Sequence, residues 1–376
     1  MVVLLRDPTL DGNPSSVHGR GRRARAVVED ARAAVAAAVG AETLGVTFTS
    51  GGTEADALAI VGVSRARRAA GAACGLLSSV IEHPAVLGAG EALVAEGVAR
   101  EFVDLDAQGR VRPERVEAAL RANPALGVVS LAAANHELGN VNDIPAIVAA
   151  ARRVGAERGE SIVVHSDAVQ AFGKVRVDFG AWDLDLMSIS SHKIYGPKGV
   201  GALIHRPGQV LAPLWTGGSQ ERGRRVGTEA VPAIHGFGVA AALVGEELED
   251  RRVHIVALRD RLLAGLSALE GADVQGDPAH NLGNTVLVEL RGCPGELMLM
   301  NLDLEGVAVS TGSACNSGRF AASKVLLALE QAPERAGCAL RFSLGKGNSE
   351  AEVDRVLSLL PTLVERVRAA ASGAPG

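Results

Sequence analysis

One lysine stands where it could do covalent chemistry. The stretch SISSHKIYGPKG, residues 188–199, places Lys193 between a histidine and a tyrosine, after an apolar run and before a glycine-containing turn. Arginine is permanently charged and cannot act as an amine nucleophile, whereas a lysine whose pKa is lowered can. We therefore interpret Lys193 as a nucleophilic amine. The other lysines lie in turn-like or surface-like contexts and are predicted to be solvated: Lys174, Lys198, Lys324 and Lys346.

A carboxylate is predicted near this lysine. Asp167 ends the apolar stretch SIVVHSDA, residues 161–168, and a buried carboxylate is costly unless it is paired. One crossover segment separates Asp167 from Lys193, so two neighbouring parallel strands would deliver both side chains to one sheet edge. Considered alone, Asp167 could equally be a structural ion pair or a helix cap.

An anion site is predicted at the start of a helix. TSGGTEA, residues 49–55, follows a strand pattern and has small residues that let backbone N–H groups approach an anion at a helix N-terminus. The stretch lacks the lysine of a nucleotide P-loop. An ordinary helix cap with a capping-box-like glutamate explains it about as well when it is taken alone.

A lysine, an aspartate and an anion-binding helix end are together the requirements of pyridoxal phosphate. The lysine binds the cofactor covalently, the aspartate keeps the pyridine nitrogen protonated, and the helix end binds the phosphate. Ser190, His192 and Tyr195 supply polar groups nearby.

The elements that must position these residues alternate between strand and helix patterns. Helices are expected at 20–39, 52–68, 85–97, 112–121 and 144–159, and buried strands at 45–50, 75–80, 100–105, 126–134, 161–168, 185–191 and 199–208. Apolar strands that alternate with helices predict an α/β fold with a mainly parallel sheet covered by helices. A long helical pattern over 230–269 then leads into a second, smaller α/β region that ends in a helix over 349–371.

Composition excludes several classes of protein. The net charge is −5, with no basic block, so nucleic acid is not an expected partner. No apolar run approaches the roughly 18 residues of a membrane helix, and the first residues lack the cationic region of a signal peptide. The four cysteines form no CxxC, so we expect no disulfide framework, no metal site and a reducing cytoplasm.

Eight motifs give the chain a specific resemblance. FTSGGTEADALAI, IEHPAV, ANHELG, HSDAVQ, SSHKIYGPKGVGAL, RRVGTEAV, STGSACNSG and LRFSLG occur in the order found in cysteine desulfurases. The chain resembles the NifS/IscS-type branch of these enzymes, which belong to the class V aminotransferase group. The resemblance covers nearly all of the chain. It implies a fold-type-I, pyridoxal-phosphate-dependent enzyme with a seven-stranded sheet, a large domain over 13–245 and a small C-terminal domain over 246–376.

The resemblance also implies roles for individual residues. Lys193 would bind the cofactor covalently, Asp167 would pair with its ring nitrogen and Gln170 with its ring hydroxyl. His83 would stack on the ring and relay protons. The phosphate would be bound by Gly52, Thr53, Ser190 and His192, with Thr228 reaching across a dimer interface. Asn135 and Arg341 would hold the substrate carboxylate.

Cys315 differs from the other cysteines in its surroundings. It lies in STGSACNSG, a run of small polar residues typical of an exposed loop, where a thiol can be activated. This loop resembles the long catalytic loop of the IscS-type branch. Structural roles are predicted for the other three: Cys74, Cys293 and Cys338.

The chain departs from the family pattern at its start and at three positions. No segment like the family's YLDNAATTP precedes NPSSVHGRG, residues 13–21, so we expect this chain to bind cofactor yet turn over poorly. Three residues stand where asparagine, glutamine and glycine are common: His136, Asn142 and Ser191, respectively.

The sequence therefore predicts a homodimeric cysteine desulfurase. It would convert L-cysteine to L-alanine and move the sulfur onto Cys315 for an acceptor protein, either an iron–sulfur scaffold or a tRNA-thiolation partner. Three alternatives remain: a selenocysteine lyase, another class V enzyme such as an aminotransferase, or a catalytically impaired scaffold of the same fold. A thiol in a flexible loop favours the desulfurase.

Overall fold

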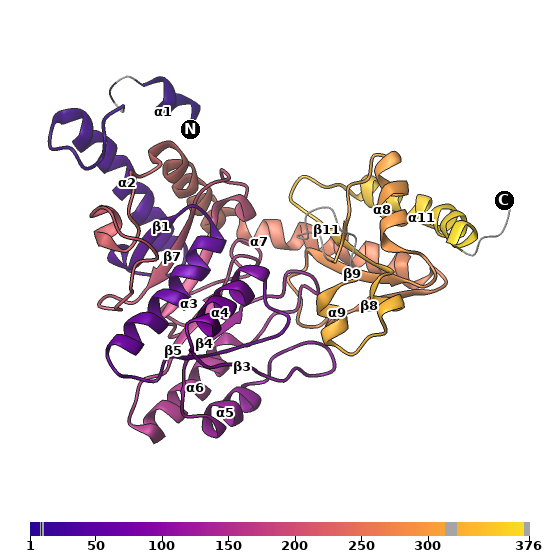
Figure 1. Cartoon of the computed structure of the whole chain (residues 1–376). Coiled ribbons are helices and arrows are strands. Elements are labelled where there is room, and N and C mark those ends of the chain that lie inside the picture. The colour runs from indigo at the N-terminus through magenta and orange to yellow at the C-terminus, as the bar shows by residue number, and fades with distance from the viewer. Residues whose placement is uncertain (8, 10, 313–321, 372–376) are drawn as a thin grey trace. The chain divides into compact units, whose positions relative to one another are not determined.

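The computed structural model describes residues 1–7, 9, 11–312 and 322–371. The chain divides into two compact units (Figure 1). Unit 1 comprises residues 1–104, 111–133 and 142–248, and unit 2 comprises residues 105–110, 134–141 and 249–376. The domain division at residues 245 and 246 stays a sequence prediction.

Unit 1 is built on a seven-stranded sheet of order β1-β7-β6-β5-β4-β2-β3. Its strands are β1 (Val46–Thr49), β2 (Gly75–Ser78), β3 (Arg100–Phe102), β4 (Leu126–Ala132), β5 (Val163–Asp167), β6 (Leu186–Ser190) and β7 (Gly201–His205). The pairs from β6 through β5, β4 and β2 to β3 are parallel, whereas β7 is antiparallel to both of its neighbours. The predicted mainly parallel sheet is confirmed.

Helices accompany these strands in the expected alternation. They are α1 (Val2–Arg6), α2 (Gly19–Ala38), α3 (Gly52–Ala69), α4 (Pro84–Ala95), α5 (Pro113–Ala122) and α6 (Ile144–Arg158), with short 3₁₀ turns η1 (Thr43–Gly45), η2 (Ser191–Ile194) and η3 (Gln220–Gly223). Helix α3 packs on β6, β7 and α4 (Figure 1). It begins only three residues after β1 ends, so its first turn lies close to the end of that strand.

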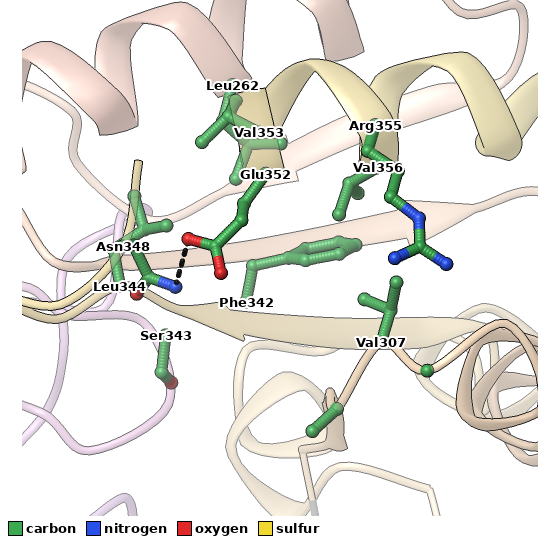
Figure 2. A pocket seen from close by; sticks show the side chains of 12 residues that line it. Leu262, Val307, Phe342, Ser343, Leu344, Asn348, Glu352, Val353, Arg355 and Val356 are labelled. Atoms are coloured by element: carbon green, nitrogen blue, oxygen red, sulfur yellow. Dashed lines mark hydrogen bonds between the residues drawn. The ribbon is translucent and has the colours of Figure 1, made fainter. Parts of the chain in front are cut away.

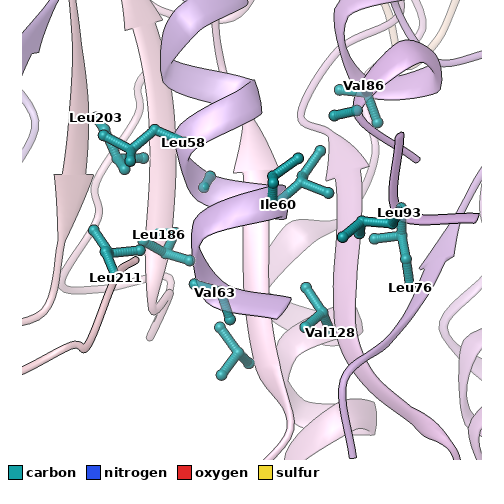
Figure 3. Close-up of a cluster of buried hydrophobic side chains, with 14 of the residues drawn as sticks. Leu58, Ile60, Val63, Leu76, Val86, Leu93, Val128, Leu186, Leu203 and Leu211 are labelled. Atoms are coloured by element: carbon teal, nitrogen blue, oxygen red, sulfur yellow. The ribbon is translucent and has the colours of Figure 1, made fainter. Parts of the chain in front are cut away.

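The core of unit 1 fixes where α3 sits. Leu58 and Val63 of α3 belong to one buried cluster with Leu186 of β6, Leu203 of β7 and Val128 of β4 (Figure 3). Ala55, Leu58 and Ala59 of the same cluster follow the three-to-four spacing of an amphipathic helix. Every residue of β4, β5, β6 and β7 is buried, as expected for central strands. Packing therefore holds the helix N-terminus in place relative to the strand ends.

Unit 2 contains an antiparallel four-stranded sheet of order β10-β11-β9-β8. Its elements are β8 (Ala272–Gln275), β9 (Thr285–Leu290), α8 (Gly295–Leu304), β10 (Ser310–Thr311), α9 (Lys324–Ala328), α10 (Pro333–Ala336), β11 (Ala339–Ser343) and α11 (Glu350–Ala371). Leu340 and Phe342 of β11 share a core with Leu360 and Val364 of α11.

Helix α7 (Val231–Ser267) contributes residues to both units. It is long and apolar enough, by length and composition alone, to cross a membrane. Ile234, Phe237 and Ala241 are buried in its first half, and Leu258 and Leu262 in its second. A charged stretch, residues 246–252, separates the two halves.

Candidate active site

Asp167 and Lys193 lie at the carboxyl ends of two paired parallel strands. Asp167 is the last residue of β5 and pairs with Ser188 of β6, and Lys193 follows β6 within η2. Burial raises the pKa of Asp167, while the backbone N–H of Val169 and the nearby Lys193 ammonium oppose that rise. The structure thus brings together the two side chains that the sequence placed at one sheet edge.

The first turn of α3 reaches the same edge. A side-chain carbon added at Gly52 would come within 2.7 Å of Val169, in the turn after β5, and within 3.6 Å of Ser190. Gly52 is buried and Thr53 exposed, and the Ser190 hydroxyl lies 2.9 Å from Nδ1 of His192. Backbone N–H groups of a helix N-terminus, a serine and a histidine form a donor set suited to phosphate.

Glu54 anchors the loop that leads into α3. Its carboxylate accepts hydrogen bonds from the backbone N–H of Ser50, at 2.6 Å, and from Nε of Arg225, at 2.9 Å. Burial raises the pKa of Glu54, but these two partners outweigh it and the pKa is lowered. Glu54 therefore stays ionised and holds the turn in place.

His83 caps α4 with its ring. Its Nδ1 accepts the N–H of Ala85 at 3.1 Å, so a neutral ring carries its proton on Nε2. Burial and then the charge of Lys193 lower its pKa. The electrostatic contact with Lys193 places His83 at the same edge as Asp167.

Gln170 and Lys174 lie in the turn after β5. The ammonium of Lys174 donates to the side-chain Oε1 of Gln170 at 2.6 Å and to its backbone oxygen at 2.9 Å. Lys174 is half-buried, so the sequence prediction of a solvated lysine is wrong. Sequence reasoning missed this contact, for which the i, i+4 spacing from Gln170 was the available signal.

Two further buried acids, Asp56 and Glu82, were missed by sequence reasoning. Asp56, Glu82 and Asp167 are only 1%, 4% and 7% exposed. Burial raises the pKa of Glu82 to about 8; the N–H of Ala132, donated to Oε2 at 3.0 Å, opposes that rise and the charge of Asp167 adds to it. Burial and the charge of Asp167 also raise the pKa of Asp56. Burial beside the Asp167 carboxylate thus favours the protonated form of both Asp56 and Glu82.

His165 completes this buried polar row. Its ring nitrogens lie 2.9 Å from the hydroxyls of Ser130 and Ser188, and Nε2 is 3.7 Å from Asp56. Burial lowers its pKa to about 3, so the ring is neutral.

The two candidate substrate-binding residues both belong to unit 2. Asn135 accepts the N–H groups of Glu137 and Leu138 at 2.9 Å each, which fixes a tight turn. Arg341, on β11, donates from Nη1 to the backbone oxygen of His136 in this turn at 2.8 Å. Within the described part of the chain, the buried Nε of Arg341 has no hydrogen-bond partner. The structure thus brings the two residues together, with a donor of Arg341 left for a ligand.

Thr228 and Cys315 are placed differently. Thr228 is exposed in the segment between η3 and α7. The preceding turn, η3, is anchored by Glu221, which forms a buried ion pair of 2.7 Å with Arg32. Cys315 lies outside the described residues.

The described cysteines resemble structural ones. Cys293 is fully buried, and burial raises its pKa and that of half-buried Cys338. Cys74 is half-buried beside the core of unit 1. A raised thiol pKa disfavours the nucleophilic thiolate.

One cavity of the described chain lies apart from these side chains. It occupies about 250 Å³ within unit 2 (Figure 2). Phe342, Val353 and Val356 line it with apolar groups. The carboxylate of Glu352, which also lines it, accepts the N–H of Ser349 at the start of α11. None of the candidate catalytic or binding residues lines this cavity.

The residues at the sheet edge fit pyridoxal phosphate. An amine, a buried carboxylate, an imidazole and an amide surround the edge, and a helix N-terminus approaches so closely at Gly52 that any side-chain carbon would displace Val169. These are the groups that covalent attachment, the ring nitrogen and the phosphate require.

Comparison with known proteins agrees with this chemistry. The family described as aminotransferase class-V matches residues 9–356. The chain belongs to the aminotransferase class-V family. Within this family it is 40% identical over 357 residues to a cysteine desulfurase IscS from Methanosarcina thermophila, covering 95% of this chain and 86% of the relative. It is 42% identical over 364 residues to a cysteine desulfurase from Cereibacter sphaeroides, covering 95% of this chain and 90% of the relative.

Solved structures of other proteins share the fold. A NifS-like protein superposes with a TM-score of 0.87 at 33% identity, covering 97% of this chain and 94% of that one. DndA from Streptomyces lividans superposes with a TM-score of 0.75 at 35% identity, covering 92% of this chain and 95% of DndA. The predicted fold and enzyme class, a pyridoxal-phosphate-dependent cysteine desulfurase, are confirmed.

Proposed function

We propose that this cysteine desulfurase binds its cofactor through Lys193 and collects the sulfur of L-cysteine on Cys315. The observation that supports this most is the parallel pairing of β5 with β6, which places Asp167 at the end of one strand and Lys193 just after the end of the next, so that the charge of Lys193 acts on Asp167 and His83. When bound, pyridoxal phosphate supplies an electron sink for the negative charge that develops at the substrate Cα. Everything else in the reaction is the work of this chain's own residues.

Asp167 and its neighbours hold the ring. The Asp167 carboxylate keeps the proton on the ring nitrogen, and Gln170 donates to the ring hydroxyl. His83 would pack against the ring and relay protons. Gly52, Thr53, Ser190 and His192 bind the phosphate. Thr228 of a second copy completes the phosphate site, so the enzyme works as a homodimer.

Asn135 and Arg341 bind the substrate carboxylate. Arg341 offers its buried Nε for this purpose, since Nη1 is already bonded to the turn at His136. The Lys193 amine would hold the cofactor and would act as the base for the Cα proton.

Cys315 then takes the sulfur. Its thiolate attacks the substrate sulfur, a sulfur–sulfur bond forms, and the carbon–sulfur bond breaks with its electron pair left on carbon. Protonation of that carbon and of Cα gives L-alanine, and the enzyme retains a persulfide. A cytoplasmic acceptor, an iron–sulfur scaffold or a tRNA-thiolation protein, removes the sulfur.

The test is to incubate the cofactor-loaded protein with L-cysteine and to quantify alanine and persulfide together. We expect alanine to form, with the first equivalent of sulfur mapped by mass spectrometry to Cys315. Alanine formation without any protein persulfide would indicate a lyase. Cofactor binding with no reaction would indicate a scaffold.

A further inference from the structure

The contact between Lys174 and Gln170 fixes which way an amide faces. An ammonium group has only donors, so the amide atom that meets Lys174 Nζ at 2.6 Å has to be the oxygen. The NH₂ group of Gln170 is then turned away from Lys174 and has two protons to donate. The usual ambiguity between amide oxygen and nitrogen is thus removed by the chemistry of the partner.

The turn that carries both residues is closely packed. Gly173 has a positive φ of 78°, and a side-chain carbon there would come within 2.5 Å of Ile194, next to Lys193. At the other end of the turn, Val169 packs against Gly52. The turn therefore lies between the start of α3 and the lysine-bearing η2, with little room to shift.

The Lys174 ammonium also acts on the phosphate side of the site. Burial lowers the pKa of His192, and the charges of Lys193, Lys198 and Lys174 lower it further. Lys174 thus lies within electrostatic reach of a candidate phosphate-binding side chain.

We propose that Lys174 is a positioning residue, which locks the Gln170 amide with its NH₂ group toward the ring oxygen of the cofactor. This inference rests on the proposed cofactor site. A hydrogen bond from the ammonium polarises the amide, which strengthens its N–H groups as donors. The acceptor best suited to these N–H donors is an electron-rich oxygen such as a phenolate.

The test is a double-mutant cycle on cofactor affinity, measured by titrating the apoprotein with pyridoxal phosphate. We expect Lys174→Met to weaken binding about tenfold, the size of one lost hydrogen bond involving a charged group. Gln170→Ala should weaken binding to a similar extent. The double variant should bind no more weakly than Gln170→Ala, because Lys174 acts through Gln170.

Two further variants separate positioning from charge and from stability. Lys198→Met removes an exposed charge that also acts on His192, and it should change affinity less than twofold. Lys174→Arg keeps the donor and should restore most of the affinity and the visible absorption maximum of the bound cofactor. Gln170→Glu keeps the Lys174 contact but loses the NH₂ donors, so it should bind as weakly as Gln170→Ala.

Three results would overturn the proposal. These are unchanged affinity in Lys174→Met, multiplicative effects in the double variant, or an equal loss in Lys198→Met. The visible absorption maximum should shift alike in Lys174→Met and Gln170→Ala, which a purely structural lysine would not cause. If the unmodified apoprotein failed to bind pyridoxal phosphate at all, the proposed function would fail instead.

Discussion

The hydroxyl of Ser323 donates a 2.5 Å hydrogen bond to the buried carboxylate of Glu137. Ser323 also caps α9 by accepting the N–H of Leu326 at 3.1 Å. Gly312 lies beside the same carboxylate oxygen, since a side-chain carbon there would come within 2.4 Å of Glu137 Oε2. Glu137 therefore lies close to Gly312 and to Ser323, which stand on either side of the stretch 313–321 in the sequence.

Gly312→Ala should damage this arrangement. The added methyl group would collide with Glu137 and with Ser323, whose Cβ would lie 2.7 Å away. We expect a loss of roughly 1–3 kcal/mol in the free energy of unfolding, as for other overpacked sites. Urea denaturation measures it, with Gly347→Ala as the control because that glycine has open space around it. Equal stability of the two variants would contradict the contact.

Glu82→Gln should flatten the pH dependence of stability. Burial raises the pKa of Glu82 to about 8, so the folded state binds a proton that the unfolded state releases above its ordinary pKa. The free energy of unfolding of the wild type therefore falls as the pH rises through that window. Glutamine can still accept the Ala132 N–H but does not titrate. Denaturation of both apoproteins between about pH 5 and pH 8 should show a smaller fall in the variant.

Glu221→Gln should destabilise unit 1. Arg32 and Glu221 have side chains only 4% and 2% exposed, and the Glu221 carboxylate also accepts the N–H of Phe48 at 2.9 Å. Removing the Glu221 charge leaves buried Arg32 with Glu29 as its remaining carboxylate, at 3.2 Å and half exposed, so we expect a loss of about 3 kcal/mol, the lower end of the range for a broken buried pair. Thermal unfolding measures the loss, and Arg252→Gln, in an exposed pair, is the control. A loss no larger than the control's would show that the pair is not the anchor we describe.

Lys193→Ala should abolish covalent attachment of the cofactor. Borohydride reduction of the wild type, followed by peptide mapping, should place the label on Lys193, and the variant should take up none. Lys198 is the internal control, since it is a lysine five residues away in the same turn region. Label on Lys198 would show that the attachment site is misassigned.

Cys315→Ser should abolish persulfide formation while the visible spectrum of the bound cofactor is kept. Cys293→Ala removes a buried thiol with a raised pKa and should alter stability alone. Mass spectrometry after brief exposure to L-cysteine distinguishes the two. A persulfide on Cys293 or Cys338 would refute the assignment.

The sheet and its strand ends could be predicted because local sequence patterns determine them. The apolar runs that end at Asp167 and precede Lys193 are typical of parallel strands, and the carboxyl ends of such strands meet at one edge. The helix predicted over 20–39 is found at Gly19–Ala38. The antiparallel pairing of β7 could not be predicted, because its apolar pattern is the same in either direction.

The buried acids and the Lys174 contact depend on partners far apart in the sequence or on a particular turn. The buried carboxyl of Glu82 accepts a hydrogen bond from the N–H of Ala132, which is fifty residues away in the sequence. Lys174 is drawn inward because Gly173 allows the turn to close on Ile194. A single sequence shows neither which N–H group lies near Glu82 nor how the turn at Gly173 closes. Carboxylates and lysines are therefore predicted to be solvent-exposed by default.

Unit 2 is assembled from three separate segments of the chain, which affects how the protein folds during synthesis and where it can be cut. During synthesis, residues 105–110 and 134–141 emerge long before residues 249–376, with which they cluster. Their mature environment, including the bonds from Arg341 to His136 and from Ser323 to Glu137, can form only once the C-terminal third has been translated. A fragment of residues 249–376 would contain Arg341 but not the turn at residues 134–141 to which Arg341 bonds. The two units therefore cannot be separated by a single cut in the chain.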